Sequence, residues 1–141
     1  MSRPIKVAAG ILQDAAGRVL VTERLGDSPF AGLWEFPGGK VGNGEDSETA
    51  LCRELLEELG LTVQAYEFFM RVEHSYPDRD VSLDFYLVTR WTSEPKGLEG
   101  QRMRWLVPDL LDTAELLPAD APVVAALRAR PAPLRKCLSE T

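Results

Sequence analysis

Three glutamates at helical spacing are the residues of this sequence best placed to do chemistry. Glu54, Glu57 and Glu58 stand at positions i, i+3 and i+4, so in a helix they occupy about a third of the circumference. A solvated acidic face is the ordinary explanation, but such a face brings basic partners four residues away. Here Glu54 and Glu58 repel each other, and Glu58 lies near the helix C-terminus, where the macrodipole disfavours negative charge. A bound cation would offset this repulsion, and carboxylates without His or Cys favour Mg²⁺ or Mn²⁺ over zinc.

A glycine-rich segment with basic residues nearby precedes the glutamates. Residues 37–40 read Pro-Gly-Gly-Lys, and glycines let backbone groups approach a ligand closely. Arg24 and Lys40 supply positive charge in the same part of the chain. Neither a Walker A motif nor a dinucleotide-binding fingerprint occurs in the sequence. The combination therefore indicates polyphosphate binding through the carboxylates and a divalent cation.

Local patterns predict the elements that position these residues. Asp46 or Ser47 can cap a helix over residues 47–59, in which leucines recur every fourth residue, and Gly60 can end it. Residues 27–44 are rich in Gly and Pro, which predicts a loop leading into this helix. The three glutamates would then lie opposite much of the leucine stripe.

Two β-hairpins and a second helix complete the expected fold. Apolar, β-branched runs at 5–12 and 18–24, separated by Asp and Gly turn residues, predict the first hairpin. Alternating strands at 63–76 and 81–87 predict the second. The remaining elements are a short strand at 102–107 and a closing helix at 122–130. Strands before, between and after two separated helices indicate a mixed α/β or α+β sandwich.

The length and charge of the chain limit what it can bind. Its 141 residues fit one domain, which we place at residues 1–130, followed by a C-terminal tail at 131–141. Sixteen Lys and Arg against twenty-two Asp and Glu give a net charge of -6, which argues against binding to duplex nucleic acid. Most of the acidic excess lies between residues 45 and 58, which favours a free nucleotide that arrives with its cation.

Cysteine, histidine and hydropathy patterns exclude further classes of protein. Cys52 and Cys137 form no CxxC pair, which argues against zinc-ribbon and thioredoxin-like sites. His74 is the only histidine, which excludes a multi-histidine metal site. No run approaches the ~18 apolar residues of a membrane span, and the start of the chain lacks the apolar core of a signal peptide. We expect a cytoplasmic protein with reduced thiols and no membrane partner, present as a monomer or weak dimer.

The residues around the glutamates resemble the Nudix family. The Nudix box is matched at every defining position by Gly39, Glu45 and the segment RELLEELGL at 53–61. The resemblance covers roughly residues 4–130 and is closest to the MutT-type 8-oxo-dGTP diphosphatases, through residues 34–40, 76–79 and 97–100. It implies an α/β/α sandwich with a mixed β-sheet, in which the box forms a catalytic loop-helix-loop motif.

The resemblance also assigns roles to the residues of the box. The implied metal ligands are the Gly38 carbonyl and the carboxylates of Glu54, Glu57, Glu58 and Glu99. Arg53 would pair with a box glutamate and orient it, and Glu45 would hold the loop. Either Glu54 or Glu57 would act as general base and take a proton from the attacking water.

The implied reaction is the hydrolysis of a nucleoside triphosphate to the monophosphate and pyrophosphate. Its cofactor would be Mg²⁺, with Mn²⁺ as a possible substitute, and Arg24 and Lys40 would meet the phosphates. The substrate implied by the MutT resemblance is 8-oxo-dGTP, whose removal from the nucleotide pool avoids mutation. The expected partner is therefore a small nucleotide and not a nucleic acid.

The implied base pocket contains one departure from the MutT pattern. Its lining residues would be Phe36, Tyr76, Arg79 and Val81, together with Ile5 and Val7, although core packing explains the apolar ones equally well. Asp120 stands where MutT-type enzymes usually present Asn. An ionised Asp120 only accepts hydrogen bonds, which suits the amino group of cytosine or the N–H edge of guanine, whereas a protonated one also donates. Two enzymatic alternatives stay open, an 8-oxo-dGTP diphosphatase and a CTP or oxidised-pyrimidine pyrophosphohydrolase, beside a non-catalytic nucleotide-binding module.

Overall fold

Two β-sheets and two α-helices make up the fold, which the computed structural model describes for residues 4–26 and 30–130. In chain order the elements are β1 (Ile5–Leu12), β2 (Val19–Glu23), β3 (Trp34–Glu35), β4 (Gly38–Lys40), α1 (Ser47–Leu59), β5 (Thr62–Tyr76), β6 (Arg79–Thr92), β7 (Met103–Leu106), three 3-10 helices (Pro108–Leu110, Thr113–Glu115, Pro118–Asp120) and α2 (Ala121–Ala129). The expected tail at 131–141 lies outside the described residues, as does Cys137.

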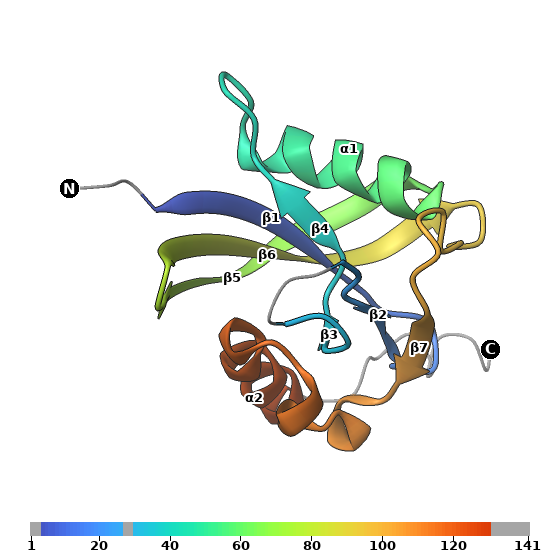
Figure 1. Ribbon diagram of the computed structural model, residues 1–141. Helices are drawn as coiled ribbons and strands as arrows, with labels where there is room; N and C mark the ends of the chain where they lie inside the picture. The colour runs from blue at the N-terminus through green and yellow to red at the C-terminus, as the bar shows by residue number, and fades with distance from the viewer. Residues whose placement is uncertain (1–3, 27–29, 131–141) are drawn as a thin grey trace.

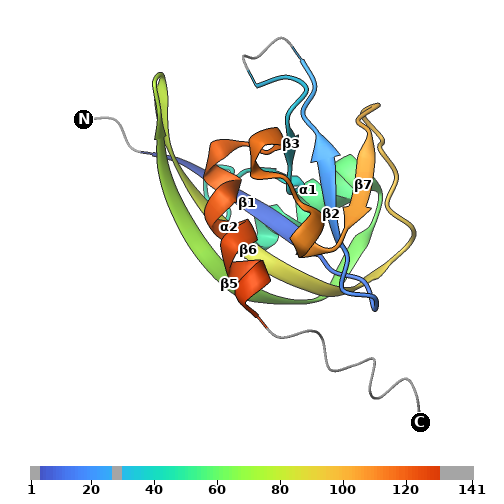
Figure 2. The same ribbon diagram turned by 90° about the horizontal axis from the view of Figure 1, so that it is seen from below.

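The central sheet is mixed and is covered by a helix on each face. Its order is β4-β1-β6-β5, in which β1 and β6 run parallel and the other neighbours run antiparallel. Side chains alternate across β1, so Ala8 and Leu12 join the core under α1 whereas Ala9 and Ile11 join the core under α2. The two helices lie on opposite sides of the sheet (Figure 1), and α2 crosses β1 and β6 when seen from below (Figure 2). The expected mixed-sheet α/β/α sandwich is confirmed.

The smaller sheet, of order β3-β2-β7, shows that the first predicted hairpin is wrong. The predicted turn exists, because the Asp14 N–H donates to the Arg18 carbonyl at 3.0 Å and the Asp14 carboxylate accepts the Arg18 N–H at 2.9 Å. Beyond an isolated bridge between Gln13 and Val19, however, β1 and β2 belong to different sheets. Turn residues indicate that the chain reverses locally, but they do not determine which strands pair. Packing on both faces of β1 favours its pairing with β4 and β6.

Two very short strands lie within the segment 27–44 that the sequence predicts as a loop. β3 pairs with β2, and β4 pairs with β1. Strands of two or three residues have no alternation to detect, and the glycines of β4 have low strand propensity. Pairing with β1 places β4 against α1 (Figure 1), so the glycine-rich segment lies beside the helix that carries the glutamates.

The helix predicted at 47–59 is confirmed as α1, with the predicted ends. The Asp46 carboxylate accepts the Thr49 N–H at 2.7 Å, which satisfies one of the free donors of the first turn. Gly60 adopts the left-handed conformation at φ 71° and donates its N–H to the Leu56 carbonyl at 3.0 Å. The leucine stripe is fully buried against the sheet, so the opposite face of the helix is free for the glutamates.

The other predicted elements are confirmed, although β6 is twice as long as the strand predicted at 81–87. β5 and β6 form one long antiparallel hairpin, β7 is the expected short strand, and α2 is the closing helix. The 3-10 helices between β7 and α2 carry no periodic signal in the sequence. Among the helices in the described ranges, none has the length and apolar character needed to cross a membrane.

A buried acid ties the last 3-10 helix to the loop after β3. Asp120 is only 2% exposed, and its Oδ2 accepts the Phe36 N–H at 3.2 Å. Next to it, the Ala119 N–H donates to the Tyr76 hydroxyl at 3.2 Å. Burial raises the pKa of Asp120 to about 8, and the negative charge of Glu35 adds to the rise, while the Phe36 N–H and Arg24 oppose it. At pH 7 this pKa keeps Asp120 mostly in its protonated, neutral form in the folded protein.

The raised pKa of Asp120 predicts how stability depends on pH. Between the ordinary pKa of 3.8 and about 8, the folded state holds a proton that the unfolded state releases, so stability falls as pH rises. One such proton contributes a slope of up to about 1.4 kcal/mol per pH unit. In Asp120→Asn the shape is kept and this contribution disappears. Urea unfolding of both proteins across this pH range should therefore give a flatter profile for the variant, with equal stabilities at the acidic end. Parallel profiles would show that Asp120 is ionised in the fold.

Candidate active site

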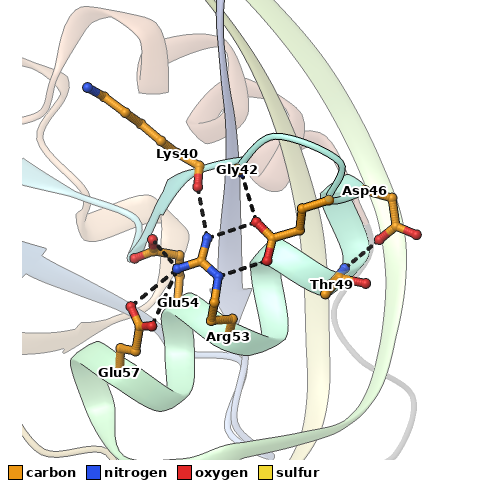
Figure 3. Close-up of polar contacts among 8 residues, drawn as sticks. Lys40, Gly42, Asp46, Thr49, Arg53, Glu54 and Glu57 are labelled. Atoms are coloured by element: carbon orange, nitrogen blue, oxygen red, sulfur yellow. Dashed lines mark hydrogen bonds and ion pairs between the residues drawn. The ribbon is translucent and has the colours of Figure 1, made fainter.

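Arg53 connects the glutamates of α1 to the loop that precedes the helix (Figure 3). Its Nε and Nη2 donate to the two carboxylate oxygens of Glu45 at 2.8 and 2.9 Å, and Nη2 also donates to the Lys40 carbonyl at 3.1 Å. Its Nη1 donates to Glu54 at 3.0 Å and to Glu57 at 3.3 Å. All five guanidinium N–H donors are thereby used. The guanidinium fixes two of the predicted catalytic carboxylates relative to each other and to the loop.

Glu45 is held in its ionised form by this arrangement. It accepts both parallel hydrogen bonds from Arg53 and a third from the Gly42 N–H at 2.8 Å. These contacts lower the pKa of Glu45 to about 2, and the hydrogen bonds to Glu45 and Glu54 raise the pKa of Arg53. The predicted role of Glu45 in holding the loop agrees with these bonds, because the side chain closes residues 40–45 onto the helix.

Gly39 lets the carboxylate of Glu54 lie directly against the backbone of β4. A Cβ atom at position 39 would collide with the carboxylate of Glu54, so any other residue would displace that carboxylate. The Glu54 side chain is mostly shielded from solvent, with 16% of it exposed. Only glycine at this position keeps Glu54 between Arg53 and the glycine-rich strand.

Glu58 and Glu99 face a small hollow beside Glu54. The hollow has a volume of about 190 Å³ and is also lined by Gly38, the residue predicted to offer its carbonyl to a metal. Burial raises the pKa of Glu58 to about 9, helped by a hydrogen bond with Glu54 and by the charges of Glu54, Glu99 and Glu35. Burial is the largest cause of this rise, and the neighbouring negative charges add to it.

The donor set of the hollow fits a hard divalent cation. Every predicted ligand offers oxygen, and the crowded acids gain from a positive charge between them. Within the described ranges, no three acidic, histidine or cysteine side chains are yet close enough together to form a closed metal cage. The structure brings Gly38, Glu58 and Glu99 to one hollow, and the side chain of Glu54 is hydrogen-bonded to that of Glu58. Glu57 instead turns toward Arg53, with 56% of its side chain exposed.

A larger cavity of about 540 Å³ lies beside the hollow, and it collects every residue predicted for the base pocket. Its walls come from β1, β6, the tip of the β5–β6 hairpin and the last 3-10 helix. The predicted residues on these walls are Ile5, Val7, Phe36, Tyr76, Arg79, Val81 and Asp120, with Arg24 and Lys40 among the others. Some of the apolar members also pack in the core, since Phe36 is only 3% exposed and belongs to the core cluster on the α2 side of the sheet. Their contact with a base stays a prediction.

Arg24, Glu35 and Gly38 line both the cavity and the hollow, so they form the wall between the two. Arg24 Nη1 donates to Glu35 at 3.0 Å, and burial raises the pKa of Glu35 despite the opposing charge of Arg24. The Nε of Arg24 is buried and has no hydrogen-bond partner in the part of the chain that the structure describes. An unused donor on this wall is suited to an acidic ligand that extends across it.

Sequence reasoning missed Glu35 and the aromatic side of the cavity. Glu35 stands between Trp34 and Phe36 in a segment expected to be an irregular loop, and only its pairing with Arg24 shows its place. Phe30 also lines the cavity, with its ring 5.1 Å from that of Tyr76. An acid between two large aromatic residues in a glycine-rich segment is the signal that could have indicated Glu35.

Comparison with known proteins identifies the family of the chain. A family model for the NUDIX domain matches residues 3–127. The 8-oxo-dGTP diphosphatase of Escherichia coli K12 is 40% identical over 126 residues, covering 89% of this chain and 98% of that protein. The CTP pyrophosphohydrolase of the same organism is 35% identical over 125 residues, covering 89% of this chain and 92% of that protein.

A solved structure from work on MutT of Aliivibrio salmonicida and Vibrio cholerae superposes with a TM-score of 0.75. Its sequence is 36% identical, and the match covers 89% of this chain and 97% of the other. The family match spans most of the chain, and these relatives are covered along nearly their whole length. The chain belongs to the Nudix family.

Proposed function

We propose that this protein is a Mg²⁺-dependent pyrophosphohydrolase of nucleoside triphosphates, with 8-oxo-dGTP as its preferred substrate and 8-oxo-dGMP and pyrophosphate as products. The observation that carries the proposal is the wall of Arg24, Glu35 and Gly38, which the base-sized cavity shares with the acidic hollow. A nucleotide with its base in the cavity would extend its phosphates across this wall to the glutamates. The similarity to the 8-oxo-dGTP diphosphatase of E. coli supports the same substrate.

The chain supplies the groups that this reaction needs on the phosphate side. When bound by the Gly38 carbonyl and the glutamates, a Mg²⁺ ion would supply positive charge to the triphosphate and increase the acidity of water. Glu54 or Glu57 would take the proton from the attacking water, and Arg53 orients both carboxylates through its Nη1. Arg24 offers its unused Nε donor, and Lys40 adds a second positive charge for the phosphates.

Asp120 supplies the polar group that would read the base. A neutral carboxylic acid offers one O–H donor and one acceptor, which is the pair that the amide of Asn would offer. An oxidised guanine presents a carbonyl beside an N–H on the edge where ordinary guanine has two acceptors, so it matches this pair. The raised pKa of Asp120 therefore supports the guanine substrate despite the change from Asn.

The second candidate substrate is CTP or an oxidised pyrimidine nucleotide. If nucleotide binding ionised Asp120, its oxygens would only accept hydrogen bonds and would suit the amino group of cytosine. The similarity to the CTP pyrophosphohydrolase of E. coli favours this alternative. A non-catalytic nucleotide-binding module is disfavoured, because Arg53 and all three glutamates of the box are present. We keep a cytoplasmic location and a monomer or weak dimer as predictions.

Loss of the Glu54 carboxylate tests the catalytic part of the proposal. Glu54→Gln keeps the shape of the side chain but removes a base and a cation ligand, so kcat should fall on the order of a hundredfold or more. Glu48→Gln, in the exposed first turn of α1, is the matched control and should keep its activity. Steady-state release of pyrophosphate measures both, with circular dichroism confirming the fold. An active Glu54→Gln variant would contradict the assignment of the site.

A substrate panel tests the choice of base. The neutral form of Asp120 predicts that kcat/KM is highest for 8-oxo-dGTP when this nucleotide is compared with dGTP, CTP and dCTP under identical conditions. Ordinary dGTP should be a poorer substrate because its N7 lacks a proton. If kcat/KM for CTP exceeds that for 8-oxo-dGTP, the preferred substrate is CTP and the proposal of 8-oxo-dGTP is wrong.

The pH profile of substrate use tests the protonation state of Asp120. Ionisation above about pH 8 removes its donor, whereas Asp120→Asn keeps a donor at every pH. The ratio of kcat/KM for 8-oxo-dGTP between wild type and Asp120→Asn should therefore fall by about tenfold from pH 7 to pH 9. This ratio cancels the pH dependence of the chemical step, which the two proteins share. A ratio that stays constant would show that Asp120 does not read the base as a neutral acid.

A further inference from the structure

The C-terminal end of α1 is bound by the loop that carries Glu99. A helix leaves its last carbonyl groups without helical partners. The Leu59 carbonyl accepts the Lys96 N–H at 2.9 Å, and the Glu58 carbonyl accepts the Leu98 N–H at 3.1 Å. These bonds bring a loop about forty positions later in the sequence onto the end of the helix that holds the box glutamates.

Glu99 lies at the third position of a tight turn in this loop. The turn spans residues 97–100 and is closed by a hydrogen bond from the Gly100 N–H to the Gly97 carbonyl at 3.0 Å. Glu99 itself is exposed, so side-chain packing does not fix its position. The place of its carboxylate at the hollow therefore depends on the backbone bonds of the turn.

Gln101 joins the backbone of Glu99 to the backbone of Glu58. Its Oε1 accepts the Glu99 N–H at 2.9 Å, and its Nε2 donates to the Glu58 carbonyl at 3.3 Å. Gln101 is buried, with only 7% of its surface exposed, and it lines the same hollow as the two glutamates. Only an amide of this length offers a donor and an acceptor that span both groups, because a carboxylate lacks the donor and Asn is shorter.

We propose that Gln101 is a positioning residue that sets the separation of Glu58 and Glu99 at the hollow and thereby the affinity of this site for a divalent cation. The inference rests on the proposed function, in which both glutamates face the cation. Gln101 acts through the backbone of Glu99 and Glu58 and contributes no ligand of its own. Without Gln101 the Glu99 N–H loses its partner, and among the described residues the loop is held to α1 only by the bonds of Lys96 and Leu98. Holding the Glu99 carboxylate at the hollow then costs more conformational entropy.

Two variants remove the link in different ways. Gln101→Met keeps the length of the side chain but has no amide, and Gln101→Asn keeps an amide that cannot reach both partners. The matched control is Gln13→Met, because Gln13 is a buried glutamine that donates to the Gly17 carbonyl at 3.4 Å and lines neither the cavity nor the hollow. All three variants lose hydrogen bonds of the fold, but only the first two loosen Glu99.

Titration with Mn²⁺ alone, followed by electron paramagnetic resonance of the free ion, measures the affinity without nucleotide. Both Gln101 variants should raise the Kd for Mn²⁺ by about tenfold, whereas Gln13→Met should leave it unchanged. In turnover, kcat at limiting Mn²⁺ should fall and should recover at saturating Mn²⁺, with the KM for nucleotide unchanged. A merely structural role would move the melting temperature of all three variants and leave the Kd as in wild type.

A double-mutant cycle with Glu99→Gln separates positioning from direct ligation. Helix α1 holds the backbone of Glu58 in place without Gln101, so the effect of Gln101 on the cation reaches it through Glu99. Adding Gln101→Met to Glu99→Gln should therefore cause no further rise in the Kd. Additive effects, or a wild-type Kd in both Gln101 variants, would overturn the inference while leaving the proposed function intact. Absence of Mn²⁺ binding to the wild-type protein, or full activity of Glu54→Gln, would overturn both.

Discussion

The structure of the site depends on the repulsion among carboxylates that the fold holds together. Glu58 and Glu99 line one hollow, and Glu54 is hydrogen-bonded to Glu58 beside the backbone of β4. Burial and the neighbouring negative charges favour the protonated form of Glu58. A protein without use for such a cluster gains from separating it. In this chain, however, Arg53, the glycine-containing strand β4 and the loop at 97–100 keep the acids in place. In the proposed function a divalent cation would offset the repulsion, and it would allow a chain of net charge -6 to bind a polyphosphate.

A mostly apolar cavity lies next to the acidic hollow. The N-terminal halves of β1 and β6 and the last 3-10 helix line this cavity. Its few polar groups include the buried Asp120, whose raised pKa favours the neutral form. Arg24 and Glu35 stand between the two spaces as an ion pair. In the proposed arrangement, a ligand that fills both spaces would have an apolar end in the cavity and an anionic end that meets the cation. A nucleotide has this polarity, so its base would be read in one space and its phosphates would react in the other.

The parts of the site that are local in sequence could be predicted, and the parts made by long-range contacts could not. Helix α1 follows from its cap, its leucine spacing and Gly60. The roles expected of Arg53 and Glu45 come from the resemblance to the Nudix box, which is a short segment of the chain. Pairing of β1 with β6 could not be read from the sequence, because the alternation of a strand does not name its partner. The proposed role of Gln101 could not be predicted for the same reason. It depends on a hydrogen bond to the Glu58 carbonyl, and only folding brings these two residues together.

The central claim is that one ligand spans the cavity and the acidic hollow, with a divalent cation at the glutamates. A crystal structure with Mn²⁺ and 8-oxo-dGMP, with data collected at the manganese absorption edge, tests this claim directly. The account predicts an anomalous peak within coordination distance of the Gly38 carbonyl and the carboxylates of Glu54, Glu58 and Glu99, with the base against Asp120. A manganese peak away from these glutamates, or a base bound outside the cavity, would contradict it.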